Sequence, residues 1–220
     1  MIYIRVLVIG LILFLPSQGE AKVYIDINAP SIRKLPIAIP ELKDLGSPGP
    51  SEDVGKGLYD TLIQDLEIAG LFEILDRKGY IEDSKGSGIQ LGEIDFSSWR
   101  VIGAEALIKG GFTLKWDDLA VEIRLFDVFQ EKVLIGKSYS GKKADLRRVI
   151  HRFANEVIEA LTGEKGIFET RLLLVLDTGG SKEVYIADYD GYNPRQVTRN
   201  GSINLSPQWS PDGSRILYTS

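Results

Sequence analysis

The chain has 220 residues, and its 26 lysines and arginines against 31 aspartates and glutamates give a formal net charge of −5 at pH 7. This acidic balance argues against nucleic-acid binding, because such a partner requires a basic patch that neutralises its phosphates. The sequence contains no cysteine, which excludes disulfides, cysteine-based zinc sites, thiol catalysis and an acylated lipoprotein anchor.

The N-terminus has the pattern of an export signal. Arg5 precedes an apolar run over residues 6–15, interrupted only by Gly10. This run is shorter than the roughly 20 residues that span a bilayer, and it has the length of a signal-peptide core. We therefore predict a signal peptide over residues 1–21, cleaved between Ala21 and Lys22, with cleavage after Gly19 as the alternative. The mature chain is predicted to be exported and to have no transmembrane segment.

The following residues predict a first set of short elements around one helix. That helix begins after Ser51, shows an apolar face at four-residue spacing, and ends at Gly70. The flanking segments are a strand over residues 23–27, an extended segment over 35–40, a loop over 46–50, a strand over 71–75, a mobile loop over 83–88 and a short helix over 96–102.

The middle of the chain predicts a meander followed by a second amphipathic helix. The strands are expected over residues 106–116, 119–129 and 132–140, with Asp117-Asp118 as the first hairpin turn. The helix is expected over residues 144–161, with Gly163 as its stop. Two helices stacked on one face of a mixed sheet give an α+β fold class.

From Phe168 onward the pattern changes to short strands separated by turns. The expected strands cover residues 171–177, 183–188, 195–198, 207–210 and 215–219. Arg171-Leu172-Leu173 and Arg215-Ile216-Leu217 stand about 44 residues apart, within the period of a four-stranded propeller blade. The pattern therefore predicts the first part of a β-propeller.

Residues suited to catalysis or metal binding are few. His151 is the only histidine, and its helical position places it beside the apolar stripe on the wetter side, which favours a surface or domain-junction role. Residues 188–193 (Asp-x-Asp-Gly-x-Asn) lack the downstream glutamate of a calcium loop and predict a turn. The carboxylates of residues 117–118 predict a solvated hairpin tip. We expect no catalytic residue, cofactor, metal or small-molecule substrate.

Several motifs together resemble the TolB family. Residues 205–218 and 183–198 resemble its propeller repeat, in which a packed tryptophan precedes an Asp-Gly turn. Further matches lie at Asp65-Leu66 with Gly70-Leu71-Phe72, Trp99 with Gly103-Ala104-Glu105, and His151 with Leu161-Thr162-Gly163, Gly166-Ile167-Phe168 and Thr170-Arg171. Ala69 and Asn155 depart from the commoner family residues. Order and spacing match from Val23 to the last residue, so the chain is identified as a member of this family.

The resemblance implies an organisation and a function. Residues 22–163 would form the TolB N-terminal α/β domain, and residues 164–220 one blade and the start of a second in a propeller that has six in the family. The chain would be a periplasmic, non-enzymatic adaptor of the Tol-Pal system that contributes to outer-membrane integrity and cell division. The alternative is the gating propeller of an exported serine peptidase.

The implied partners are proteins: Pal through the propeller, and TolA through the mature N-terminus. The TolA-facing residues would be Lys22, Val23, Tyr24, Ile25, Asp26 and Ile27. A short strand at a free terminus can add to a partner's sheet edge through backbone hydrogen bonds. The same segment could equally fold back onto its own domain.

Overall fold

The computed structural model describes residues 23–27, 33–81, 88–177 and 179–220. The predicted signal peptide, the cleavage after Ala21 or Gly19, and Lys22 lie outside the described residues, as does most of the 83–88 loop. Within the described ranges, no helix combines the length and apolar character needed to cross a membrane.

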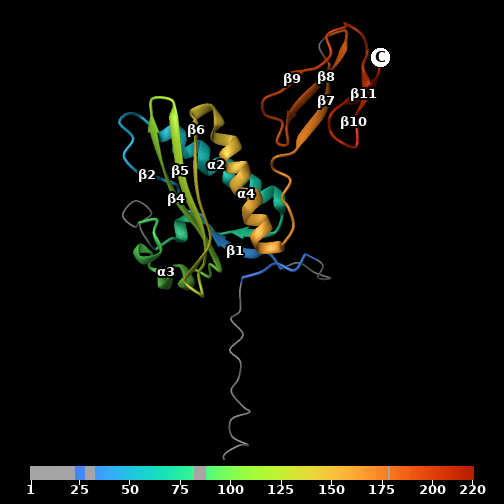
Figure 1. Ribbon diagram of the computed structural model, residues 1–220. Coiled ribbons are helices and arrows are strands. Elements are labelled where there is room, and N and C mark those ends of the chain that lie inside the picture. Colours follow the sequence, from blue (N-terminus) through green and yellow to red (C-terminus); the bar gives the residue numbers. More distant parts are fainter. Residues whose placement is uncertain (1–22, 28–32, 82–87, 178) are drawn as a thin grey trace, which may run out of the picture.

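A mixed sheet forms the centre of the first part of the chain (Figure 1). Its strands run in the order β3-β1-β4-β5-β6, with β2 beside β4. The two pairings of β1 and the pairing of β2 are parallel, and the β4–β5–β6 meander is antiparallel. The bounds are β1 Leu35–Ala38, β2 Lys43–Asp44, β3 Phe72–Ile74, β4 Ala106–Lys115, β5 Asp118–Asp127 and β6 Lys132–Lys142. The α+β fold class is confirmed.

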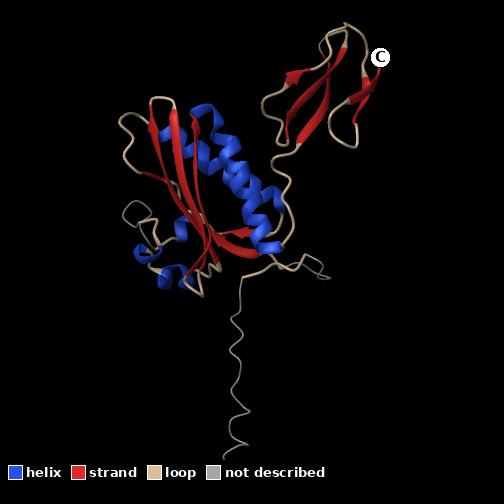
Figure 2. Cartoon of the chain, in the orientation of Figure 1, coloured by secondary structure: helices blue, strands red, loops and turns tan. Residues whose placement is uncertain are grey.

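Two long helices, α2 (Glu52–Ala69) and α4 (Leu146–Thr162), cover the same face of the sheet (Figure 2). Their apolar stripes enter one core, in which Leu58, Leu62 and Phe153 are completely buried. Both helices end as predicted, because Gly70 and Gly163 adopt φ values of 70° and 77°. Ser51 precedes α2, but its hydroxyl donates to the Asp44 carboxylate and caps no helical N–H.

A smaller apolar cluster occupies the opposite face of the sheet, beneath α3 (Phe96–Val101). Trp99 is buried there, in edge-to-face contact with Tyr80 at a centroid distance of 5.0 Å. The Tyr80 hydroxyl accepts from the Ile39 N–H and donates to the Leu75 carbonyl, and burial raises the pKa of Tyr80 to about 12. Three 3-10 helices, Arg77–Gly79, Leu91–Glu93 and Lys143–Asp145, complete this part.

The β4–β5 hairpin turns one residue earlier than predicted. Lys115 pairs with Asp118, so the turn consists of Trp116 and Asp117 rather than Asp117 and Asp118. Trp116 has a φ of 58° and is 96% exposed. A two-residue hairpin turn that matches the strand twist requires positive φ, which explains the left-handed backbone at this bulky residue.

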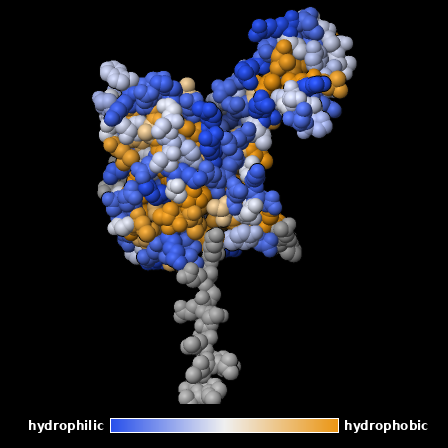
Figure 3. Space-filling view, viewed as in Figure 1, coloured by the Kyte–Doolittle hydropathy of each residue, from blue (hydrophilic) through white to orange (hydrophobic). Residues whose placement is uncertain are grey.

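The C-terminal residues form short antiparallel strands in two sheets. The strands are β7 Arg171–Asp177, β8 Lys182–Asp188, β9 Arg195–Gln196, β10 Leu205–Trp209 and β11 Ile216–Thr219. Arg171 stacks over the Trp209 ring at 5.0 Å and joins the two sheets. Apolar surface is visible here in Figure 3, and Leu217 is 74% exposed.

Candidate partner-binding site

The N-terminal segment, residues 23–27, is docked onto the chain's own fold. The Ile25 N–H donates to the carbonyl of Leu161 at 2.7 Å, and the Ile25 side chain is buried in the main core. In Figure 1 this blue segment lies at the C-terminal end of α4. The predicted strand over residues 23–27 is wrong. The structure has no strand there, and the Ile25 N–H bonds to the end of a helix rather than to a neighbouring strand.

Two further hydrogen bonds hold the same segment. The Val23 N–H donates to Asp127 Oδ2 at 3.2 Å, and the Tyr24 hydroxyl donates to the Thr162 carbonyl at 3.1 Å. Asp127 is completely buried at the end of β5. The last carbonyls of a helix have no partner within the helix, so the end of α4 offers ready acceptors.

The segment keeps the alternation that the sequence indicates. Ile25 faces the core, whereas Tyr24 and Asp26 are exposed. A net hydrogen bond contributes about 1 kcal/mol and a buried isoleucine about 2–3 kcal/mol, before the entropy of ordering is subtracted. Val23 and Ile27 also pack, partly buried, against the main core, so side chains as well as hydrogen bonds hold the docked segment.

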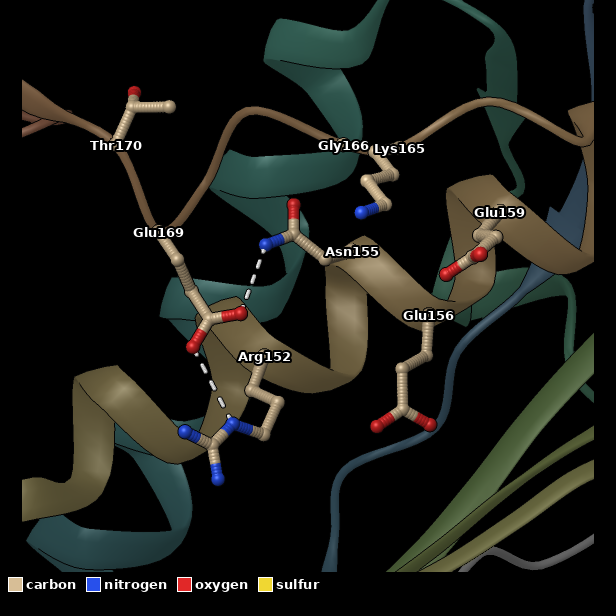
Figure 4. Close-up of a pocket in the computed structure, with 8 residues that line it drawn as sticks. All are labelled: Arg152, Asn155, Glu156, Glu159, Lys165, Gly166, Glu169 and Thr170. Atoms are coloured by element: carbon tan, nitrogen blue, oxygen red, sulfur yellow. Dashed lines mark hydrogen bonds and ion pairs between the residues drawn. The ribbon is translucent and has the colours of Figure 1, made fainter. Parts of the chain in front are cut away.

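The chain leaving α4 forms one wall of a polar pocket (Figure 4). Asn155 Oδ1 accepts from the Phe168 N–H at 3.0 Å, and its amide nitrogen donates to Glu169 at 3.2 Å. Arg152 also donates to Glu169, at 3.3 Å. These contacts fix the path between α4 and β7, which is a structural role.

His151 is buried rather than on the wetter side, so the prediction of a surface histidine is wrong. Its Nδ1 lies 2.9 Å from Asp65 Oδ2, and its Nε2 lies 3.2 Å from Asp190 Oδ2. The reason is that the turn after β8 covers this side of α4. The predicted domain-junction position agrees with this contact, but no local pattern indicates which residues complete it.

Residues 188–193 form the predicted turn. Gly191 has a φ of 83°, its N–H donates to the Asp188 carbonyl at 2.9 Å, and Asn193 donates to the Asp188 carboxylate at 2.6 Å. Beside the β4–β5 hairpin turn, the exposed Asp118 carboxylate pairs with Lys142 at 2.5 Å. Among the residues that the structure describes, no three histidine, aspartate or glutamate side chains gather to hold a metal ion.

Comparison with known families finds two matching models. The TolB amino-terminal domain matches residues 23–134, and the TolB beta propeller domain matches residues 158–220. The second match, with the strand pattern of β7–β11, confirms that the C-terminal residues are part of a β-propeller.

Curated relatives agree with these matches. The Tol-Pal system protein TolB of Desulfosudis oleivorans is 43% identical over 215 residues, which cover 97% of this chain and 49% of the relative. Its counterpart in Syntrophotalea carbinolica is 35% identical over 202 residues, covering 91% and 46%. The chain thus spans about half the length of the curated relatives it matches.

A solved structure shares the fold. The crystal structure of TolB from Acinetobacter baumannii superposes with a TM-score of 0.68 at 24% identity, covering 90% of this chain and 47% of that one.

Proposed function

Because the chain belongs to the TolB family, we propose that it acts as a non-enzymatic adaptor of the Tol-Pal system in the periplasm. In this role it binds Pal through its propeller and TolA through residues 22–27, and it contributes to outer-membrane integrity and cell division. The names of its relatives, Tol-Pal system protein TolB, support the system.

The observation that carries the TolA assignment is the docking of residues 23–27. Three hydrogen bonds and one buried isoleucine hold this segment, while Tyr24 and Asp26 are exposed. A short segment held partly by backbone N–H donors is suited to exchange these hydrogen bonds for those of a partner's sheet edge. Docked and partner-bound states would then compete.

Calorimetry tests this assignment. The chain lacking residues 22–27 is titrated with TolA beside the intact mature chain, and circular dichroism establishes that both are folded. We expect the deletion to abolish binding, while the matched variant Arg148→Gln, at an exposed site of α4, keeps the original affinity. Unchanged affinity in the deletion would remove the segment from the interface.

The serine-peptidase alternative gains no support from the described residues. A catalytic histidine requires a serine hydroxyl within hydrogen-bond reach. The described polar neighbours of the His151 ring nitrogens are the carboxylates of Asp65 and Asp190.

A further inference from the structure

The turn between β5 and β6, residues 128–131, carries an exposed aromatic side chain. Phe129 is 61% exposed, and Val101, the last residue of α3, is 76% exposed. Val133, near the start of β6, is exposed as well. Figure 1 shows α3 beside the ends of β5 and β6 that this turn joins. We call these three side chains the turn patch.

A polar bridge joins the two parts of the turn patch. The Arg100 guanidinium pairs with Glu131 at 2.7 Å and donates to the Val128 carbonyl at 3.2 Å. Because Arg100 precedes Val101, and Phe129 lies between Val128 and Glu131, this contact brings the end of α3 to the turn. Exposed apolar side chains that occur singly are ordinary, but several gathered around polar groups are typical of a protein-binding surface.

The backbone of the turn is held by hydrogen bonds. The Phe129 and Gln130 N–H groups both donate to Asp127 Oδ1, at 2.9 and 2.8 Å. Glu131 has a φ of 52°, in a left-handed region that glycine or asparagine adopts more readily. Such backbone outliers are concentrated at functional sites. An aromatic side chain on a turn that is already ordered loses less conformational entropy when a partner binds it.

The carboxylate that holds the turn also holds the N-terminal segment. Asp127 Oδ2 accepts from the Val23 N–H at 3.2 Å, so one completely buried carboxylate binds the segment through one oxygen and the turn through the other. The amide nitrogens of Val23 and Phe129 are thus separated only by this carboxylate group. A partner that takes residues 22–27 from their docked position therefore meets the chain beside the turn patch.

We propose that the turn patch is a second contact for the protein that binds residues 22–27, which is TolA in the proposed function. This inference rests on that function and adds to it a surface that remains on the folded domain. The partner pairs its sheet edge with the extended segment, and an apolar depression beside that edge covers Phe129.

Two linked contacts help a short segment to leave its docked state. On leaving, the segment gives up the hydrogen bonds described above and the burial of Ile25. The turn patch requires no such exchange, because its side chains are already exposed. Since the segment is tethered to the domain, the second contact forms at a high effective concentration. The patch therefore adds affinity that the segment alone lacks.

Calorimetry with TolA on the intact mature chain tests the proposal. We expect Phe129→Ser to weaken binding by about tenfold, a loss typical of truncating an interface anchor. The control is Trp116→Ser, which removes a still more exposed aromatic side chain at the other end of β5 and should keep the original affinity. Hydrogen exchange on the free chains should show residues 23–27 equally protected in both variants, which separates a lost contact from altered docking.

The outcomes distinguish this inference from the proposed function. If deletion of residues 22–27 leaves TolA binding unchanged, the proposed function fails. If the deletion abolishes binding while Phe129→Ser keeps the original affinity, the inference alone is wrong. An equal loss in Trp116→Ser also contradicts it. If Phe129→Ser alters the docking of the segment, Val101→Ser on α3 carries the same test.

Sedimentation of the free chain tests the other possible occupant of the turn patch. We expect Phe129→Ser to leave the oligomeric state unchanged. A dimer of the intact mature chain that dissociates in this variant would assign the patch to a second copy of the chain, and it would overturn the proposal.

Discussion

The N–H of Ile25 donates to the carbonyl oxygen of Leu161 over 2.7 Å, which joins the first described residues of the chain to the last turn of α4. Because this carbonyl has no partner within the helix, the bond fills an acceptor that α4 leaves open. The N-terminal segment can leave without breaking any hydrogen bond of the helix itself.

Ile25→Ala tests how the segment is held. A buried isoleucine replaced by alanine loses about 2–4 kcal/mol of packing. The remaining hydrogen bonds, at about 1 kcal/mol each, then have to offset the entropy of ordering the segment, about 1–2 kcal/mol per residue. We expect hydrogen exchange to show residues 23–27 unprotected, with β4–β6 unaffected. Ile68→Ala, at an isoleucine of α2 that is 50% exposed, is the control and should leave the segment docked. Persistent protection in Ile25→Ala would contradict this account.

The lowered pKa of Asp44 leads us to expect a loss of stability in acid. Burial opposes its ionisation, but hydrogen bonds from the Ser51 hydroxyl and from the Ser47 and Gly46 N–H groups outweigh it, and they lower the pKa of Asp44 to about 2. The ionised carboxylate therefore stabilises the fold fully above about pH 4, and this contribution is lost as pH falls towards 2.

Denaturant unfolding at a series of pH values measures this effect. The stability difference between the wild-type chain and Asp44→Asn should be constant above about pH 4 and shrink below it. Ser51→Ala removes one of the hydrogen bonds, so it should raise the pKa of Asp44 towards its ordinary value. When the same comparison is made in the Ser51→Ala background, the stability difference should therefore shrink over a narrower range of pH. A difference that stays constant to pH 2 would be inconsistent with this role.

Trp116→Asn is expected to stabilise the chain. A bulky residue at a φ of 58° costs about 1–2 kcal/mol, whereas asparagine adopts this conformation readily. The 96% exposed side chain contributes little packing that would be lost. Urea unfolding should therefore show a gain of about 1 kcal/mol. Trp116→Phe keeps the strain and is the control. A destabilised asparagine variant would show that the indole makes a contact that stabilises the chain by more than the relieved backbone strain.

Gly166 lies where a side chain cannot fit. A Cβ added there would stand 2.2 Å from Asn155 Oδ1, the acceptor for the Phe168 N–H. We expect Gly166→Ala to cost about 1–3 kcal/mol in thermal or urea unfolding. In an Asn155→Ala background the same change should cost less, since the clashing atom is gone. Strict additivity of the two changes would refute the coupling.

The sequence predicts the helices and long strands well because their signals are local. Gly70 and Gly163 end α2 and α4 by their own backbone preference, and four-residue apolar spacing identifies the buried faces. β2 is different. It has two residues and exists through its parallel pairing with β4, so no pattern within it could reveal it.

The features of the candidate site that sequence patterns missed are long-range. Alternation in residues 23–27 correctly indicates that Ile25 faces the core, but the acceptor on Leu161 belongs to a distant helix. His151 lies off the apolar stripe of α4, and it is buried because Tyr189 and Asp190 arrive from another part of the chain. Helical periodicity describes one helix, and the surface that covers its polar side is not encoded there.

The three tryptophans stand in three different surroundings. Trp99 is buried beneath α3, Trp116 is almost fully exposed at a hairpin tip, and Trp209 lies against Arg171 among the C-terminal strands. The fluorescence of each indole therefore comes from surroundings of a different polarity, and each indole differs in its access to a dissolved quencher such as iodide. Single-tryptophan versions of the chain would report optically on the sheet interior, the hairpin tip and the propeller strands, without any attached dye.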